Sequence, residues 1–353
     1  MLFVTNRIPD QGAASEPRTI TFNNEKVDIS NSLFYCEYRE GELTERMSDG
    51  FLADLKNCRK NNVLFFLHGY RTPFLRAIQK GRSLQTLLDR IDPDLVEVVT
   101  LAWPCRDVTD RVKTYWTDQD AADMAGPIFA RVLSRFMLWR AHPEQVKDPC
   151  LKRIHVLAHS MGNRVLTNIL NSWGHSFGGG GVPLVFRNVF MVAADVPSTT
   201  LERHQPGDLI TKAARNVVVY YAGDDKRMDE SILANAVRGP YASEDNPIEQ
   251  IGQSIYFSGD TSTRLGHFGP EDPEKTRRNV YRINCDQFND HFDAKGGHSY
   301  LLTDGPDDPK GSGFQVTGNV SPVLRHVANA IMTGQVVADE QRAYDLKFEP
   351  GEP

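Results

Sequence analysis

A serine, an aspartate and a histidine occur in this chain in an order that suits nucleophilic catalysis. Ser160 comes first, Asp225 follows and His298 comes last, which is the order of one of the recurring serine triads. A serine hydroxyl is a poor nucleophile until a base takes its proton, and histidine does this best when a carboxylate fixes its tautomer. We therefore expect Ser160 as nucleophile, His298 as general acid and base, and Asp225 as the group that orients the imidazole.

The serine lies in a tight turn between an apolar run and a helical pattern. The turn reads Ala158-His159-Ser160-Met161-Gly162 and directly follows the run Ile154 to Leu157. A strand, a small-x-Ser-x-small turn and a helix together are typical of a nucleophile elbow. On so tight a turn the residues two before and two after the serine must be nearly bare. Gly162 meets this demand fully, and Ala158 adds only one methyl group.

Other residues compete for two of these roles. Asp195 also follows a buried-type apolar run and is the main alternative to Asp225 as the acid, with Asp224 a weaker alternative. Aspartates after strands are also common turn residues and helix caps, so a structural role is open to each of them. His291 is an alternative to His298, but it lacks the two glycines that precede His298.

A second loop offers donors for a developing negative charge. The apolar run Val63 to Leu67 ends at His68-Gly69-Tyr70. The backbone amides of Tyr70 and Met161 are the expected oxyanion hole, in which each donor contributes roughly 3 kcal/mol. The side chains expected near the substrate are aromatic or imidazole groups: His68, Trp103, His159, Tyr115 and Trp116. Local hydrogen bonding is the alternative for the two histidines, and core packing is the alternative for the aromatic residues.

Strand-like and helix-like segments must alternate to place these residues together. The expected strands cover residues 63–67, 96–102, 154–157, 186–194, 217–221 and 279–285, and the main expected helices cover 74–89, 118–141 (kinked or reset at Pro127) and 321–332. Residues 106–117 are expected to form a polar loop near the site. The alternation predicts the α/β class, with a mostly parallel, doubly wound sheet and helices on both faces. Ligands of such sheets bind beyond the carboxyl ends of the strands, where the candidate residues fall.

The domain organisation follows from the same pattern. We expect a single domain over residues 1–335, followed by a charged, loose tail over 336–353. Within the domain, residues 1–60 supply the first strands and a helix, 61–304 form the catalytic core, and 319–335 form a closing helix. Residues 239–274 are a long segment rich in Gly, Pro and Ser, and we expect them to form a cap or an active-site loop.

Composition excludes several classes of partner and cofactor. The 353 residues are 40% hydrophobic and carry a net charge of −6, so a broad basic face for nucleic acid or anionic lipid is not expected. The five cysteines are scattered without a CxxC pair, which favours reduced thiols in a cytoplasmic protein and argues against zinc or a disulfide framework. No stretch approaches the length of a membrane span. The expectation is a small-molecule substrate without a metal or organic cofactor, and the sequence does not specify an oligomeric state.

Several motifs also carry a family resemblance. The chain resembles the bacterial α/β-hydrolases grouped as an uncharacterised esterase/lipase superfamily, over roughly residues 1 to 304. The motifs are Leu2-Phe3-Val4-Thr5-Asn6-Arg7, Phe65-Phe66-Leu67-His68-Gly69-Tyr70, Leu101-Ala102-Trp103-Pro104, His155 to Arg164, Ala193-Ala194-Asp195, Tyr220-Tyr221, Arg264-Leu265-Gly266 and Gly297-His298-Ser299-Tyr300. The resemblance implies an α/β-hydrolase fold and a triad of Ser160, Asp225 and His298. The chain departs at Ala158, where many relatives of the wider fold carry glycine.

The sequence therefore predicts a serine hydrolase that acts on carboxylic esters. A lipase or phospholipase would use the same triad but needs an apolar lid, and residues 239–274 hold few large apolar side chains. Thioesterase and amidase activities share the machinery. The contrasting class is a non-catalytic binding protein with a hydrolase-like fold. In that class Ser160, an acid and His298 would not converge.

Overall fold

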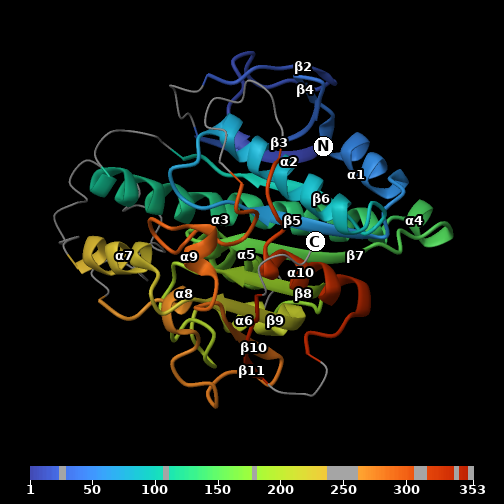
Figure 1. The fold of residues 1–353 in the computed structure, drawn as a ribbon. Helices are drawn as coiled ribbons and strands as arrows, with labels where there is room; N and C mark the ends of the chain where they lie inside the picture. Colours follow the sequence, from blue (N-terminus) through green and yellow to red (C-terminus); the bar gives the residue numbers. More distant parts are fainter. Residues whose placement is uncertain are drawn as a thin grey trace.

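One mixed sheet organises the part of the chain that the computed structural model describes, namely residues 1–23, 29–105, 111–176, 181–236, 261–305, 316–337 and 342–348. Its strands are β1 (Leu2–Arg7), β2 (Arg18–Thr19), β3 (Ile29–Arg39), β4 (Glu42–Glu45), β5 (Asn62–Leu67), β6 (Val96–Ala102), β7 (Arg153–His159), β8 (Phe186–Val192), β9 (Ala214–Tyr221), β10 (Val280–Asn284) and β11 (Ala343–Asp345). They are hydrogen-bonded in the order β11-β10-β9-β8-β7-β5-β6-β1-β3-β4-β2 (Figure 1).

Most of this sheet is parallel. Every pairing from β11 across to β1 is parallel, and only the extension made by β3, β4 and β2 is antiparallel. All six residues of β5 are buried, as expected for a central strand covered on both faces. The predicted mostly parallel sheet is therefore confirmed.

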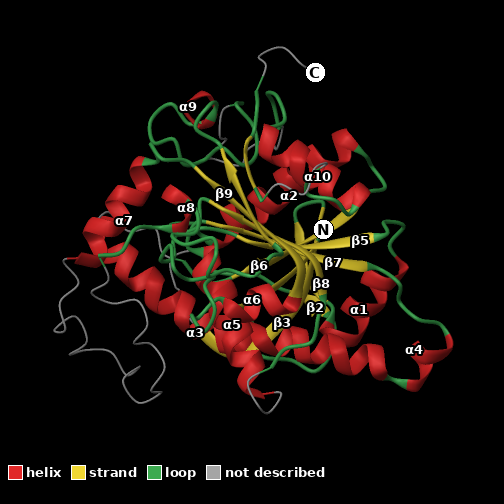
Figure 2. Cartoon of the chain, turned by 90° about the horizontal axis from the view of Figure 1, so that it is seen from below, coloured by secondary structure: helices red, strands yellow, loops and turns green. Residues whose placement is uncertain are grey.

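Helices cover both faces of the sheet. They are α1 (Met47–Asn57), α2 (Phe74–Ile91), α3 (Arg111–Ala141), α4 (Pro143–Lys147), α5 (Gly162–Ser176), α6 (Asp208–Ala213), α7 (Lys226–Ala236), α8 (Leu265–Phe268), α9 (Asn289–Phe292) and α10 (Pro322–Thr333). One apolar core joins the sheet to α1, α3, α5 and α6, and a second joins its other face to α2 and α10 (Figure 2). Within the described ranges, none of these helices combines the length and apolar character needed to cross a membrane.

Helix α3 begins earlier than the sequence suggested. Residues 106–110 of the predicted polar loop lie outside the described residues, but α3 already starts at Arg111 and continues through Pro127. Tyr115 and Gln119 lie one turn apart, are both buried and hydrogen-bond to each other at 3.2 Å. Thr114 and Tyr115 therefore lie on a buried face of the helix, and the prediction of a loop over 111–117 is wrong.

The predicted tail is also partly ordered into the fold. Ala343–Asp345 form β11, which pairs in parallel with β10 at the edge of the sheet. Leu346 and Phe348 pack against the core on the α10 side. This apolar packing was not apparent among the surrounding charged residues. Of the segment 239–274, residues 239–260 lie outside the described residues and the remainder contains α8.

Two buried histidines stay neutral inside the fold. His155 on β7 contacts Asn62 on β5 at 3.4 Å and Asn188 on β8 at 3.1 Å. Burial, together with the nearby charge of two arginines, lowers the pKa of His155 to about 3. Burial likewise lowers the pKa of His68, which follows β5, to about 3. Both rings therefore resist protonation until the chain unfolds.

We predict that the folded protein loses stability in mild acid. The unfolded chain binds protons at these histidines near pH 6.5, whereas the folded chain does not until about pH 3. The lowered folded pKa values therefore contribute stability above pH 6.5 that is lost as the pH falls. Between about pH 7 and pH 5.5 the two sites together should lower the free energy of unfolding by about 2.5 kcal/mol, which urea unfolding measures. In His155→Gln the fall should be smaller by about 1.25 kcal/mol, the share of one site, and an unchanged fall would contradict the assignment to His155.

Candidate active site

Ser160 lies on a strained turn between β7 and α5. Its φ angle is +53°, in the left-handed region that non-glycine residues rarely adopt. Its amide donates to the carbonyl of Val192 on β8 at 3.0 Å. At Gly162 an added Cβ atom would lie 2.5 Å from the carbonyl oxygen of Leu67, so no side chain fits there. The turn has the geometry of a nucleophile elbow, with the steric demand at residue 162 that the sequence predicted.

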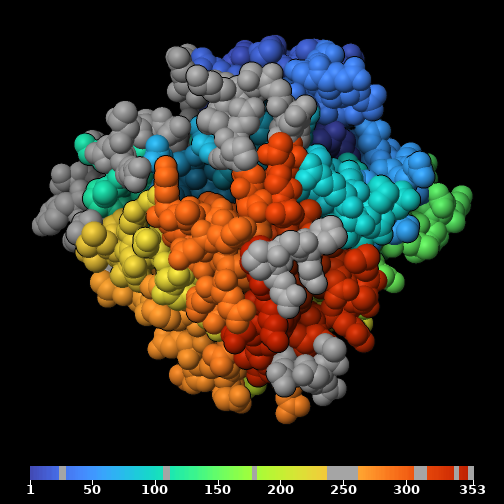
Figure 3. All heavy atoms as spheres, in the orientation of Figure 1, coloured from blue at the N-terminus to red at the C-terminus, as the bar shows by residue number. Residues whose placement is uncertain are grey.

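The structure brings Asp225 and His298 together. The Oδ2 atom of Asp225 and the Nδ1 atom of His298 are 2.7 Å apart, and the Asp225 side chain is fully buried. Asp225 follows β9 and directly precedes α7, while His298 lies in the loop after α9. On the surface, the orange part of the chain that follows residue 260 adjoins the yellow of α7 in Figure 3. A carboxylate on Nδ1 leaves Nε2 as the imidazole nitrogen available for proton transfer.

The second oxygen of Asp225 caps helix α7. Its Oδ1 atom accepts hydrogen bonds from the backbone amides of Arg227 at 2.9 Å and Met228 at 3.3 Å. These are free amides of the first helical turn, where a carboxylate is also favoured by the helix dipole. Asp225 is therefore held from one side by the helix and presents its other oxygen to His298.

A second aspartate fixes the histidine loop. Asp293 Oδ2 accepts from the backbone amides of His298 at 3.2 Å and Ser299 at 3.0 Å, and its Oδ1 accepts from Gly296 at 3.2 Å. Gly297 has a φ of +64°, and an added Cβ atom there would lie 2.7 Å from the Asn289 side chain. The glycines thus allow the sharp turn, and Asp293 is a supporting residue that the sequence reasoning missed.

Negative charge around His298 favours its protonated form. Burial lowers its pKa, but the carboxylate of Asp225, with further contributions from Asp195 and Asp293, outweighs this effect. The net result is a pKa above the usual 6.5. Electrostatics of this kind stabilise the imidazolium that forms when a histidine accepts a proton from a nucleophile.

His159 connects the elbow to the histidine loop. Its ring centroid lies 5.0 Å from that of His298, and its Nε2 atom is 3.4 Å from the His298 carbonyl oxygen. Burial lowers the pKa of His159 well below 6.5, so the ring is neutral. Among the described residues no hydrogen bond joins Ser160 Oγ to His298 Nε2. In ligand-free sites such contacts are often long and tighten when substrate binds.

The loop 68–73 approaches the elbow from the other side. At Gly69 an added Cβ atom would lie 3.0 Å from Ser160 Cβ, so the loop carries Tyr70 close to Ser160. The next residue, Arg71, has a φ of +50°, and its amide donates to Asp118 Oδ2 at 2.8 Å. Asp118 lies on α3 and is fully buried. It supports the predicted oxyanion loop, and no local sequence signal pointed to it.

His68 and Trp103 lie beneath this loop in the core. Their rings stack in parallel with centroids 5.1 Å apart, and Trp103 Nε1 donates to the His68 carbonyl at 2.9 Å. The His68 Nδ1 atom is 2.9 Å from the Gly69 carbonyl oxygen. Both side chains are buried, and these contacts brace the loop from the core.

The alternative acids and base have other partners. Asp195 binds Tyr115 at 2.8 Å and also Ser231. Asp224 accepts a hydrogen bond from the Asn289 side chain. His291 is 3.2 Å from Asp304. In this structure only Asp225 among the candidate acids is hydrogen-bonded to the imidazole of His298.

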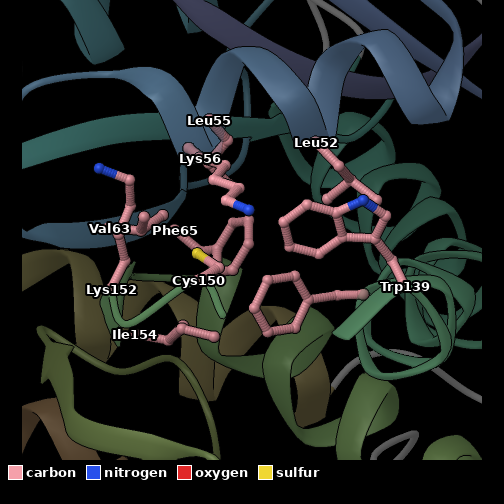
Figure 4. A pocket seen from close by; sticks show the side chains of 10 residues that line it. Leu52, Leu55, Lys56, Val63, Phe65, Trp139, Cys150, Lys152 and Ile154 are labelled. Carbon is pink, nitrogen blue, oxygen red and sulfur yellow. The ribbon is translucent and has the colours of Figure 1, made fainter. Parts of the chain in front are cut away.

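Two hollows among the described residues lie away from Ser160. One lies between α1, α3, β5 and β7, is lined mainly by apolar side chains such as Phe65 and Cys150, and has a free volume of about 10 Å³ (Figure 4). This is room for roughly one water molecule. An open hollow of about 760 Å³ is lined by Asn62 and Arg153, at the N-terminal ends of β5 and β7. Ser160 follows the opposite end of β7, so neither hollow belongs to the candidate site.

The five cysteines all lie within the described residues. All five are free, and four of them are buried. Within the described ranges no three His, Cys, Asp or Glu side chains are grouped as metal ligands would be.

The fold and the elbow together define an α/β-hydrolase. Residues 44–259 match the sequence model of the family described as "Alpha/beta hydrolase of unknown function" (DUF900). The match covers more than half of the 353 residues, and the chain therefore belongs to this family. The matched range contains Tyr70, Ser160, Met161 and Asp225 and ends before His298.

Comparison with individual proteins adds little to this assignment. A similar solved structure is that of MenH from S. aureus, at 14% identity over 65% of this chain and 76% of the other, with a TM-score of 0.21. No curated protein sequence matches the chain at a significant level.

We predict that Gly162→Ala destabilises the protein. The new methyl group would collide with the Leu67 carbonyl at 2.5 Å and the His68 carbonyl at 2.7 Å, so the elbow must shift. A loss of about 1–3 kcal/mol is expected for such overpacking, measured by thermal unfolding. Gly50→Ala is the matched control, because Gly50 lies in α1 with no atom within 4 Å of an added Cβ atom. This control should gain stability, by roughly 1 kcal/mol. Equal stability of the two variants would refute the steric argument.

Proposed function

We propose that this protein is a serine hydrolase that cleaves carboxylic esters through an acyl-enzyme intermediate. The observation that supports it most is the buried Asp225–His298 hydrogen bond of 2.7 Å beside the strained Ser160 elbow. A nucleophile, a base and an orienting acid in this arrangement activate a hydroxyl group that is otherwise unreactive.

The proposed reaction has two halves. Ser160 Oγ attacks the ester carbonyl carbon while His298 Nε2 accepts the hydroxyl proton, and the resulting oxyanion is bound by the amides of Tyr70 and Met161. Collapse of this intermediate breaks the bond to the alcohol, which leaves with the proton from His298. Water then attacks the acyl-serine with the same base, and the carboxylic acid is released.

The oxyanion donors are supported by two features of the site. Among the described residues, neither the Tyr70 amide nor the Met161 amide donates a hydrogen bond within the protein. Met161 directly precedes α5, whose N-terminus carries partial positive charge. Each such donor is worth about 100- to 1000-fold in kcat.

We predict that Ser160→Ala, Asp225→Asn and His298→Gln each abolish most of the hydrolysis of p-nitrophenyl esters of increasing chain length. For the nucleophile and the base the loss of kcat should reach about 10⁴- to 10⁶-fold, and for the acid somewhat less. Labelling of the wild-type protein by a fluorophosphonate should vanish in Ser160→Ala. His291→Gln is the control and should retain activity, because His291 contacts Asp304 away from the elbow. A folded wild-type protein that neither hydrolyses any ester nor reacts with the probe would disprove the proposal.

We predict a pH dependence set by His298. The base must be neutral to accept a proton, and its pKa is raised above 6.5, so kcat/KM should fall on the acid side with a midpoint above 6.5. Asp225→Asn removes the main influence that raises the pKa, while burial persists, so its residual activity should have a lower midpoint. The measurement is kcat/KM of both proteins across the pH range. An identical midpoint in both would show that another group controls the profile.

A further inference from the structure

Asp195 lies at the junction of the elbow with the neighbouring strand. It follows β8, and its backbone amide donates to the carbonyl oxygen of Ser160 at 3.2 Å. The chain after it is held by a short segment: Leu265 donates to Val196 at 2.8 Å, and Gly266 donates to Ala194 at 2.9 Å. An added Cβ atom at Gly266 would lie 2.2 Å from the Ala194 nitrogen, so this contact requires glycine.

The carboxylate of Asp195 is fully engaged in a buried network. Tyr115 donates to its Oδ2 atom at 2.8 Å, Ser231 donates to its Oδ1 atom, and Arg264 Nε lies 3.7 Å from Oδ1. Burial, followed by the charge of Asp195, raises the pKa of Tyr115 well above 10, so its hydroxyl remains a donor. All four side chains are buried, which makes the loss of any one partner costly.

This network reaches every part of the proposed catalytic machinery. Ser231 lies on α7, the helix that Asp225 caps, and Asn235 one turn later donates to Tyr115 at 3.0 Å. Tyr115 lies on α3, within one turn of Asp118, which holds the loop of Tyr70. The backbone of Asp195 holds the elbow itself.

We propose that Asp195 is the positioning residue that fixes α7, and with it Asp225, relative to the elbow of Ser160. The inference rests on the proposed hydrolase function. Without the Asp195 carboxylate, Ser231 and Tyr115 lose their shared acceptor and Arg264 loses one nearby buried negative charge. Helix α7 can then shift, so that Asp225 no longer holds the His298 imidazole in line with Ser160. A displacement of about 1 Å is enough to lower a rate by 100-fold.

The charged groups facing this carboxylate come from several elements. They are Arg264 beside α8, Arg164 on α5, and the ionisable hydroxyl groups of Tyr115 on α3 and Tyr70 in the oxyanion loop. His298 is faced by Asp225, Asp293, His159 and, at longer range, Asp195. Because Asp225 makes the direct contact, the acid midpoint of kcat/KM should move less in Asp195→Asn than in Asp225→Asn.

The test compares Asp195→Asn with Asp208→Asn. Asp208 is a buried aspartate paired with Lys212 and Arg277, away from the elbow, so its variant controls for the loss of a buried carboxylate that has charged partners. In Asp195→Asn we expect kcat for a p-nitrophenyl ester to fall about 10- to 100-fold with KM changed less than about 3-fold. Asp208→Asn should lose thermal stability while it keeps kcat. The rate of fluorophosphonate labelling should fall in parallel with kcat.

Two further variants keep the proposal testable if Asp195→Asn does not fold. Ser231→Ala and Tyr115→Phe each remove one hydrogen bond to the carboxylate, and each should lower kcat about 3- to 10-fold with KM nearly unchanged. Where Asp195→Asn folds, the double variant should also be measured. Ser231→Ala should lower kcat by a smaller factor in Asp195→Asn than in the wild-type protein, because the two residues act through one network.

Different results would contradict the positioning role of Asp195 and the proposed hydrolase activity. Wild-type levels of kcat in the Asp195, Ser231 and Tyr115 variants, with Asp225→Asn inactive, would overturn the positioning role and leave the hydrolase intact. An inactive, unlabelled wild-type protein would overturn both.

Discussion

The carboxylate of Asp225 serves two partners at once, and the geometry of the whole site depends on this. One oxygen satisfies the free amides at the start of α7, and the other holds His298 at 2.7 Å. The helix cap fixes the carboxylate from one side, so the imidazole meets an oriented partner. The same carboxylate therefore caps a helix and holds an imidazole, and any change to it affects both contacts.

The parallel sheet explains why distant residues meet at this point. Ser160, Asp195 and Asp225 follow β7, β8 and β9, which are neighbours in the sheet, so the carboxyl ends of these strands bring them to one edge. The loop after β5 reaches the same edge from the other side of β7. What differs between the residues is the direction in which each side chain is held. Asp225 is turned towards the histidine loop, and Asp195 is turned towards α3 and α7.

Features with strong local signals could be predicted from the sequence. The elbow was recognisable because Gly162 must be bare next to the Leu67 carbonyl, and the parallel strands because their apolar runs are continuous. The sequence favoured Asp225 over Asp195 but left Asp195 open, since both follow strands and the difference lies in contacts with Ser231 and Arg264, which are distant in the sequence. The supporting roles of Asp118 and Asp293 were missed for the same reason: each binds backbone amides in a loop that only the fold brings near.

Strand β11 protects the edge of the sheet, but it is synthesised after the strand that it covers. It covers the edge of β10 by pairing with Arg282, Ile283 and Asn284. During synthesis β10 leaves the ribosome well before residues 343–345, and until they arrive its outer backbone groups have no strand beside them. An uncovered edge is a template for pairing with another chain. A translating polysome, where identical nascent chains lie close together, is therefore a setting in which this edge can pair with another chain.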